Sequence, residues 1–236
     1  IHIGGVESTF QVWCNGFFVG IGKDSRTESE FDLTFFVSQG KNVLSLVVIR
    51  WSDGSFLEDQ DHWWHAGIYR DIFLYSTHNV WIDDIFAKAI PDENFKNGKL
   101  SIECRAEFLK NPESGWEIRA KIFHKNKVVI SNLKGIVPKS LDQTKNFGHI
   151  VNLSTTINSI ELWNSENPNL YQICISLHNS SGVAYEYRSL KIGFRKIEIK
   201  NRELLINNRP VLIKGVNRHE HDPKTGKTIS EDLMRE

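Results

Sequence analysis

The chain has 236 residues, of which 40% are hydrophobic, 25% charged and 11% aromatic, a globular composition that excludes a disordered chain. Lys and Arg number 29, as do Asp and Glu, so the formal net charge is zero and no basic surface for nucleic acid or an anionic membrane is indicated. No apolar run approaches the roughly 20 residues that a membrane-spanning helix needs.

Almost everything before residue 200 predicts β-strands. The runs 10–14 and 17–21 flank Asn15-Gly16, a pair that favours the type I′ turn of a hairpin. Further strand-like runs follow, separated by turn residues about every ten positions: 43–51, 72–75, 80–90, 100–109, 117–131 with a turn near 125–126, 150–157, 170–177 and 183–193. This spacing predicts antiparallel β-sandwiches rather than alternating strands and helices.

We place a boundary at residues 76–79, between two groups of strands. Residues 79–194 have the length and strand number of an immunoglobulin-like sandwich. Residues 1–78 are short for a sandwich and are expected to form the later part of one. Because the chain begins with Ile1 and its single methionine is Met234, we expect it to be a piece of a longer protein.

The pattern changes at residue 195. Short strands are expected at 197–199, 204–206 and 211–213, and the apolar run 211–216 predicts a buried strand. A polar loop and a helix start follow, with Ser230 as the expected N-cap. Strand, loop and helix form the first step of a parallel βα fold. The predicted fold class is therefore mainly β, with one βα step over residues 195–236.

The three cysteines, Cys14, Cys104 and Cys174, are far apart and show neither CxxC nor zinc spacing. We expect three buried free thiols, and one disulfide with a remaining thiol is the alternative. Glycosylation sequons begin at Asn152 and Asn179, and they matter only if the protein is secreted. A cytoplasmic protein is favoured, whereas a secreted or periplasmic one stays open because no signal peptide can be read.

Residues 51–65 form the first candidate site, a loop rich in acids and aromatic side chains. Aromatic faces stack on sugar rings, and carboxylates accept hydrogen bonds from hydroxyl groups or bind a cation. The alternative is a structured Ω-type loop whose tryptophans fill a core and whose acids are solvated.

Residues 217–222 form the second candidate site, after the expected buried strand. On a strand, His219 and His221 would share one face and could together meet a substrate or a metal. The alternative is a solvated loop with one structural histidine. The HExxH zinc motif is absent, and no constellation in the chain supports catalysis by itself.

Motifs at these two sites and along the chain resemble the β-galactosidases of glycoside hydrolase family two. They run in the family's order as GGVES at 4–8, VWCNG at 12–16, SRTESEFD at 25–32, RWSDGSFLEDQD at 50–61, GIYRD at 67–71, LWNSENPNLY at 162–171, GFR at 193–195 and KGVNRHEH at 214–221. The resemblance implies that residues 1–78 are the later part of a sugar-binding jelly roll. The resemblance likewise implies that residues 79–194 form an immunoglobulin-like domain and that residues 195–236 form the start of a catalytic (β/α)8 barrel.

The resemblance implies a retaining enzyme that removes terminal β-D-galactose residues from β-galactosides. Such enzymes use two carboxyl groups about 5 Å apart. In this family both are glutamates downstream of the present chain, as are the magnesium ligands, so the chain alone is expected to be inactive. The alternatives are a non-catalytic carbohydrate-binding module and another enzyme of the family, a β-glucuronidase or β-mannosidase.

Two residues take family roles by position. Asp61 matches a carboxylate that reaches the galactose site and binds a monovalent cation, sodium or potassium. His219 matches a histidine that hydrogen-bonds galactose hydroxyls. The whole protein is expected to be a homo-oligomer with no nucleic acid or membrane partner. The stretch His62, Trp63, Trp64 and His65 departs from the Met-Trp-Arg of many relatives, and this leaves the natural galactoside open.

Overall fold

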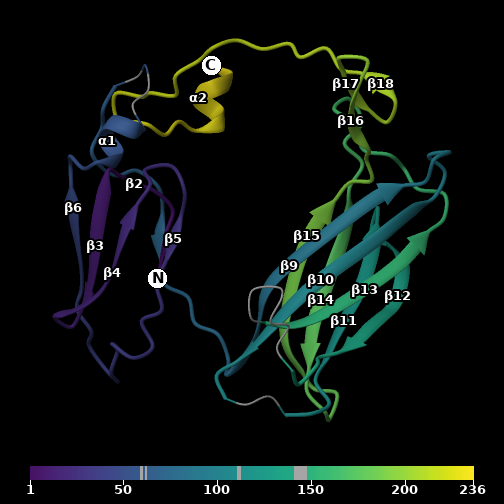
Figure 1. The fold of residues 1–236 in the computed structure, drawn as a ribbon, viewed down its shortest axis with the longest axis horizontal. Coiled ribbons are helices and arrows are strands. Elements are labelled where there is room, and N and C mark those ends of the chain that lie inside the picture. The colour runs from purple at the N-terminus through teal and green to yellow at the C-terminus, as the bar shows by residue number, and fades with distance from the viewer. Residues whose placement is uncertain (59–60, 62, 111–112, 141–147) are drawn as a thin grey trace. The chain divides into compact units, whose positions relative to one another are not determined.

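The computed structural model describes residues 1–58, 61, 63–110, 113–140 and 148–236, which form two compact units (Figure 1). Unit 1 combines Ile1–Ser76 with Gly215–Glu236, and unit 2 is Thr77–Lys214. The segment from residue 195 onward is therefore divided between the two units. Its first part packs with unit 2 and its last 22 residues pack with unit 1.

Unit 2 is an antiparallel β-sandwich, as the strand spacing predicted. One sheet has the order β13-β10-β9 and the other the order β12-β11-β14-β15, and every neighbouring pair is antiparallel. The strands are β9 (Val80–Pro91), β10 (Gly98–Phe108), β11 (Glu117–His124), β12 (Lys127–Ile136), β13 (His149–Ile157), β14 (Tyr171–His178) and β15 (Ala184–Ile192). The expected turn at Lys125 and Asn126 is present, with φ angles of 48° and 63°.

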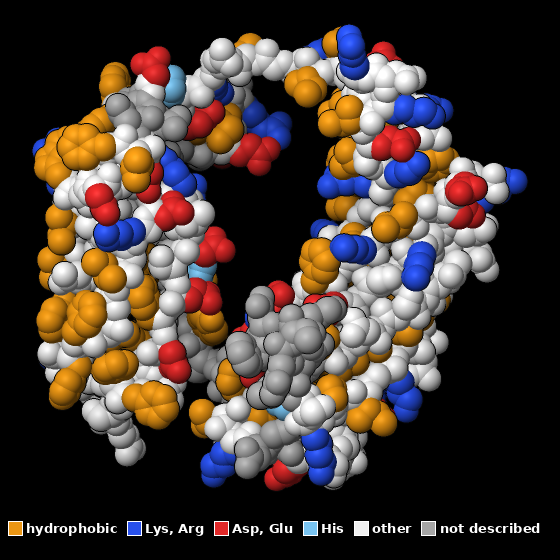
Figure 2. All heavy atoms as spheres, viewed as in Figure 1, with side chains coloured by type: hydrophobic (Ala, Val, Ile, Leu, Met, Phe, Trp, Pro, Cys, Tyr) orange, Lys and Arg blue, Asp and Glu red, His pale blue; other side chains and the backbone are white. Residues whose placement is uncertain are grey.

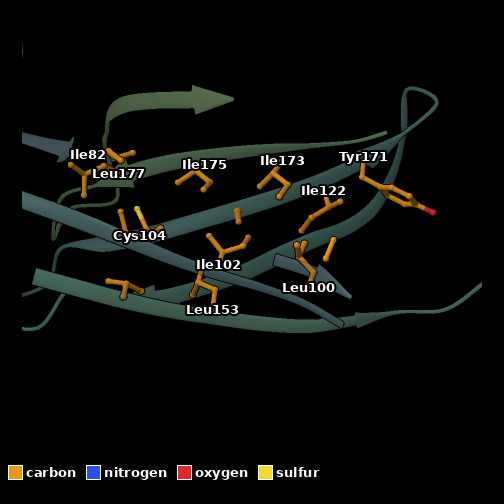
Figure 3. Packing of buried hydrophobic residues seen from close by; sticks show 14 of the residues in the cluster. Ile82, Leu100, Ile102, Cys104, Ile122, Leu153, Tyr171, Ile173, Ile175 and Leu177 are labelled. Atoms are coloured by element: carbon orange, nitrogen blue, oxygen red, sulfur yellow. The ribbon is translucent and has the colours of Figure 1, made fainter. Parts of the chain in front are cut away.

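The core of unit 2 lies between its two sheets (Figure 3). Along β14, the side chains of Ile173, Ile175 and Leu177 alternate with more exposed ones and are completely buried. Ile102 of β10 enters the same core from the other sheet. Each such side chain contributes about 1.5–3 kcal/mol through burial, so the period-two pattern holds the sandwich together.

Unit 2 also contains a small antiparallel sheet. Its strands are β16 (Ile197–Lys200), β17 (Glu203–Ile206) and β18 (Arg209–Pro210). The prediction of a buried strand over 211–216 is wrong, because no strand forms there and Leu212 and Ile213 are 79% and 78% exposed. A parallel strand needs neighbouring strands for its hydrogen bonds, and the described chain supplies none at this segment.

The described residues of unit 1 form three small sheets, with the orders β5-β1-β8, β2-β7 and β4-β3-β6. Their strands are β1 (His2–Ile3), β2 (Val6–Glu7), β3 (Thr9–Cys14), β4 (Phe17–Lys23), β5 (Ser29–Glu30), β6 (Leu44–Ile49), β7 (Gly67–Ile68) and β8 (Ile72–Phe73). The predicted β3–β4 hairpin is confirmed. Asn15 and Gly16 have φ angles of 51° and 83°, the positive values that a type I′ turn requires.

The core of unit 1 is small. Its buried hydrophobic cluster consists of Ile1, Ile3, Val6, Phe10 and Val12. Large apolar side chains of β4 and β6 are exposed instead, and hydrophobic atoms cover much of the visible surface of this unit, at the left of Figure 2. The exposed apolar side chains of β4 are Phe17, Phe18 and Ile21, and those of β6 are Val47 and Ile49.

All three cysteines are free, which confirms that part of the prediction and excludes the disulfide. Cys14 and Cys104 are buried, but Cys174 is only half-buried, so the expectation of three buried thiols is wrong for that residue. In β14, Cys174 takes the outward position between the inward Ile173 and Ile175. Burial raises the pKa of the Cys104 thiol to about 12, and the charges of Asp84 and Glu186 add to this effect.

The predicted helix start near the C-terminal end is present as α2 (Glu231–Arg235). Ser230 is its N-cap, and the Ser230 hydroxyl accepts a hydrogen bond from the backbone N–H of Leu233 at 3.2 Å. Within the described ranges, no helix has the length and apolar character that a membrane crossing requires.

Candidate functional site

The first candidate segment follows β6 and begins with a short helix that sequence reasoning did not predict, α1 (Gly54–Leu57). Asp53 is its N-cap and forms an ion pair with Lys23 at 2.9 Å. The hydrogen bond from Lys23 holds the pKa of the Asp53 carboxyl below its ordinary value. Glu58 ends the helix, and both of its carboxylate oxygens lie 3.3 Å from the backbone nitrogen of Ser25. These contacts fix the loop to the turn after β4.

Asp61 follows α1 and is exposed, as a residue that meets a ligand must be. Residues 59, 60 and 62 lie outside the described part of the chain, so the predictions that touch Asp59, Gln60 and His62 cannot be placed. The interpretation that the tryptophans of this loop fill a core is wrong. Trp51, Trp63 and Trp64 are 52%, 70% and 39% exposed.

The tryptophans form an exposed aromatic surface. The rings of Trp51 and Trp64 lie 4.8 Å apart between centroids, with 52° between their planes. The guanidinium of Arg50 lies 5.0 Å from the ring centroid of Trp51, at the distance of a cation–π contact. Exposed indole faces of this kind suit the flat apolar face of a ligand ring.

The structure brings the two candidate segments together within unit 1. The ring of His221 lies 5.1 Å from that of Trp63 and 5.6 Å from that of His65, between centroids. His219 is exposed, and its ring lies 6.2 Å from the ring of His221. The two histidines are therefore neighbours, as expected, although the strand that was to align them is absent. His221 packs against aromatic side chains of the loop of residues 51–65, and His219 remains accessible.

Residues 215–236 are held to the sheets of unit 1 by a polar contact that sequence reasoning missed. The ammonium of Lys227 donates to the carboxylate of Glu7, and the two side chains are only 7% and 15% exposed. Before Lys227, the carboxylate of Asp222 accepts the N–H groups of Lys224 and Thr225 at 2.8 and 2.7 Å. These bonds lower the pKa of Asp222. A pair 220 positions apart leaves no local signal in the sequence.

The described residues contain no group of three or more His, Cys, Asp and Glu side chains that could hold a metal ion. Asp61 offers one exposed carboxylate, which fits a single ligand of a hard cation and not a complete coordination shell.

The fold and the site together define a β-sandwich protein with exposed indole side chains beside imidazole groups, and with an exposed carboxylate in the same loop, side chains that carbohydrate sites use. Three domain families match the sequence, all from glycosyl hydrolases family 2. The sugar binding domain matches residues 1–78, the central family 2 domain residues 80–195 and the TIM barrel domain residues 197–236. The chain therefore belongs to glycosyl hydrolase family 2.

Several curated relatives are β-galactosidases. The chain is 38% identical over 231 residues to the β-galactosidase of Photobacterium profundum and 36% identical over 231 residues to that of Pectobacterium atrosepticum. It is 37% identical over 239 residues to the β-galactosidase of Priestia megaterium. These matches cover 98–100% of this chain but only 22–23% of the relatives, so the chain spans less than a quarter of their length.

Solved structures support the fold. Bacteroides uniformis β-glucuronidase 2 matches with a TM-score of 0.83 over 99% of this chain and 29% of its own, at 20% identity. The β-glucuronidase of Parabacteroides merdae matches with a TM-score of 0.81 over 99% of this chain and 30% of its own, also at 20% identity. At this identity the likeness concerns the fold alone. The mainly β class, with a sugar-binding domain, an immunoglobulin-like domain and the start of a TIM barrel, is thereby confirmed.

Proposed function

We propose that the protein to which this chain belongs hydrolyses terminal non-reducing β-D-galactose residues of β-galactosides with retention of configuration. The observation that carries the proposal is 36–38% identity to β-galactosidases over nearly the whole chain. The β-glucuronidase structures are only 20% identical. Galactosides are therefore better supported as substrates than glucuronides, which remain the alternative together with mannosides. A purely carbohydrate-binding module is disfavoured by the match of residues 197–236 to the barrel domain.

Within this proposal, Asp61 and His219 bind the sugar and do not break the bond. Both are exposed. An ionised carboxylate accepts hydrogen bonds from hydroxyl groups, and a neutral imidazole can accept one and donate one. Such groups accelerate a reaction when they bind the transition state better than the substrate. The two catalytic glutamates are proposed to lie downstream, so the 236-residue chain alone turns over no substrate.

Asp61 is also proposed to contribute one oxygen to a bound sodium or potassium ion. Since the described residues contain no group of three or more acidic, histidine or cysteine side chains that could hold a metal, further ligands are proposed to come from elsewhere in the whole protein. Magnesium is proposed to bind through residues outside this chain. We further propose a homo-oligomer and a cytoplasmic location. The free thiols of Cys14, Cys104 and Cys174 suit a reducing compartment.

The test uses the whole protein and its Asp61→Asn variant. Rates are measured on nitrophenyl β-galactoside, β-glucuronide and β-mannoside, with sodium and after its replacement by a large organic cation. We expect turnover of the galactoside only, a loss of activity without sodium, and a loss of about tenfold or more in kcat/KM for Asp61→Asn. A hydrogen bond to a charged group contributes about 1.5–3 kcal/mol, which corresponds to that factor.

Glu93→Gln is the matched control, because it removes an exposed carboxylate of unit 2 and should leave all rates unchanged. Preference for glucuronide or mannoside would replace the galactosidase proposal with the corresponding alternative. Equal sodium dependence in wild type and Asp61→Asn would remove Asp61 from the cation site.

A further inference from the structure

Two histidines from distant parts of the sequence lie side by side within unit 1. His65 belongs to the loop of residues 51–65, and His221 belongs to the polar run 217–222. Their ring centroids lie 5.6 Å apart, with 39° between the ring planes. Because more than 150 residues separate the two positions, the fold and not a local turn brings the imidazoles together.

This spacing suits two imidazoles that share one metal ion. A nitrogen-to-zinc distance of about 2.0–2.1 Å and a tetrahedral angle hold the centroids of two such rings roughly 5 Å apart. The observed 5.6 Å is close to this value, so a small rotation of the side chains brings one nitrogen of each ring to the ion. Each imidazole has two nitrogens, and the second can keep a hydrogen bond to a neighbour while the first binds the metal.

An ion can reach this pair from solvent. His65 is exposed and His221 is half-buried. The ring of Trp63 lies 5.1 Å from that of His221 and 6.3 Å from that of His65, so an indole borders the pair. An indole offers no lone pair to a cation. Since the described part of the chain contains no group of three such metal-binding side chains, water molecules would complete the coordination shell.

The charges that flank His221 in the sequence favour a cation. Asp222 follows His221 directly, and the hydrogen bond from the backbone N–H of Thr225 lowers the pKa of its carboxyl, which is therefore ionised at neutral pH. Arg218 forms an ion pair with Glu220 at 3.3 Å, so its positive charge is balanced. The carboxylates of this run thus outnumber its cations.

The ligands select the class of ion. Imidazole nitrogens suit Zn²⁺, Cu²⁺ and Ni²⁺, whereas Mg²⁺ and Ca²⁺ prefer oxygen ligands. A structural zinc site has four protein ligands, so a site with two binds more weakly and exchanges its ion with solvent. Among these ions, Cu²⁺ should bind more tightly than Zn²⁺.

We propose that His65 and His221 together bind one divalent transition-metal ion, Zn²⁺ or Cu²⁺. The bound ion fastens residues 215–236 to the loop of residues 51–65, because an ion that binds only the docked arrangement stabilises it by mass action. This binding goes beyond the proposed hydrolysis, since it requires neither a substrate nor a catalytic group.

The first experiment locates the ion. It uses the complete 236-residue chain without a histidine tag, with ¹⁵N-labelled tryptophan and with Cys174→Ser, because an accessible thiol also binds these ions. Paramagnetic Cu²⁺ is added in small steps while the seven indole N–H signals are followed by NMR. Each signal is assigned by a tryptophan-to-phenylalanine variant. We expect the Trp63 signal to lose intensity at a lower copper concentration than any other, because its ring lies beside His221.

The second experiment tests the two ligands by calorimetric titration with Zn²⁺. His65→Gln and His221→Gln should each weaken binding about tenfold or more, since each removes one of two protein ligands. His78→Gln is the matched control, because it removes an exposed imidazole of unit 2 and should bind Zn²⁺ as the parent does. His219→Gln removes the neighbouring imidazole of the same run and should also bind as the parent does. Equal Tm values without metal show that the variants are folded.

The third experiment tests the fastening. With free Zn²⁺ at 100 times its Kd, hydrogen exchange of residues 215–236 should slow by up to about 100-fold, while exchange in unit 2 stays unchanged. His65→Gln should remove this slowing, although the substitution lies outside the segment that is measured.

Four results would overturn the proposal. These are loss of another indole signal before that of Trp63, parent-like zinc binding in His65→Gln or His221→Gln, loss of binding in His219→Gln with retention in His65→Gln, and exchange of residues 215–236 that zinc does not slow. None of these measurements involves a galactoside, so each would leave the proposed hydrolysis standing. Conversely, a whole protein that hydrolyses no galactoside would leave the metal site intact.

Discussion

The two units of this chain bury their hydrophobic side chains to different extents. Among the residues that the structure describes, unit 2 has a core cluster of twenty buried residues, whereas unit 1 has a cluster of five. Unit 1 also exposes large apolar side chains along β4 and β6. The proposed sugar-binding residues all lie in unit 1, on loops after β6 and after residue 215.

The larger core therefore belongs to unit 2, and the proposed sugar-binding residues belong to unit 1. Accessible carboxylates, imidazoles and indoles cannot also contribute to a closed core. Segments with few buried contacts open at lower free energy than a sandwich core does. We therefore expect unit 1 to open more readily than unit 2, and the first prediction measures this difference.

The largest expected effect concerns two cysteines that are equally buried. Cys14 in unit 1 and Cys104 in unit 2 are 1% and 0% exposed, so a thiol reagent reaches either one only after local opening. We expect Cys104 to react at least about 100-fold more slowly than Cys14, because opening its larger core requires several kcal/mol more. Iodoacetamide labelling at pH 8, followed by peptide mass spectrometry, gives both rates.

Two controls define that comparison. In urea-unfolded chain the two thiols should react at similar rates, which shows that the native difference comes from structure. Half-buried Cys174 should react faster than Cys104 in the native chain. Equal native rates for Cys14 and Cys104 would mean that the two units open together, and the contrast in core size would then have no energetic consequence.

The second effect concerns the attachment of residues 215–236 to unit 1. Glu7→Gln removes one partner of the Lys227 pair and leaves a nearly buried ammonium without its counter-charge. We expect the docked segment to lose about 3 kcal/mol, within the range for breaking a buried pair. Hydrogen exchange of residues 215–236 should therefore accelerate, while exchange in unit 2 stays unchanged.

The control for this prediction is Glu231→Gln in α2. Its partner Arg235 and Glu231 itself are 74% and 76% exposed, and such a pair contributes about 0.5 kcal/mol or less. A double-mutant cycle with Lys227→Met isolates the pairwise energy. If Glu7→Gln accelerates exchange no more than Glu231→Gln does, the Glu7–Lys227 pair does not hold the segment.

Local patterns predicted individual strands, turns and helix caps better than they predicted the arrangement of the site. The alternation in β14, the Asn15-Gly16 turn and the Ser230 cap each depend on residues close in sequence, and all are present. The run 211–216 has the composition of a buried strand, but a strand also needs partners that periodicity cannot reveal. For the same reason, the contacts of His221 with Trp63 and His65 could not be predicted, since they join segments more than 150 residues apart.

The smallest expected effect is a pH-dependent change in Tm caused by one carboxylate of unit 2. A second carboxylate of the same unit serves as a control, because its removal should change Tm in the opposite direction. Burial raises the pKa of the Glu107 carboxyl above its ordinary value of 4.5, and the charge of Asp83 adds to this. The folded chain therefore holds this proton more tightly than the unfolded chain, so the contribution of Glu107 to stability is complete at low pH and falls as pH rises above 4.5.

Glu107→Gln mimics the protonated form, so it should raise Tm by an amount on the order of 1 °C at pH 7 and leave Tm unchanged at pH 4. The hydrogen bond from Arg119 lowers the pKa of the Glu117 carboxyl. Glu117→Gln should therefore cause a small decrease in Tm at pH values above 4.5. Calorimetry at both pH values measures these shifts. Because both residues lie in unit 2, neither change should alter the labelling rate of Cys14. A rate change at Cys14 would show that the units are energetically coupled and that the contrast in their cores is not the sole determinant of their opening.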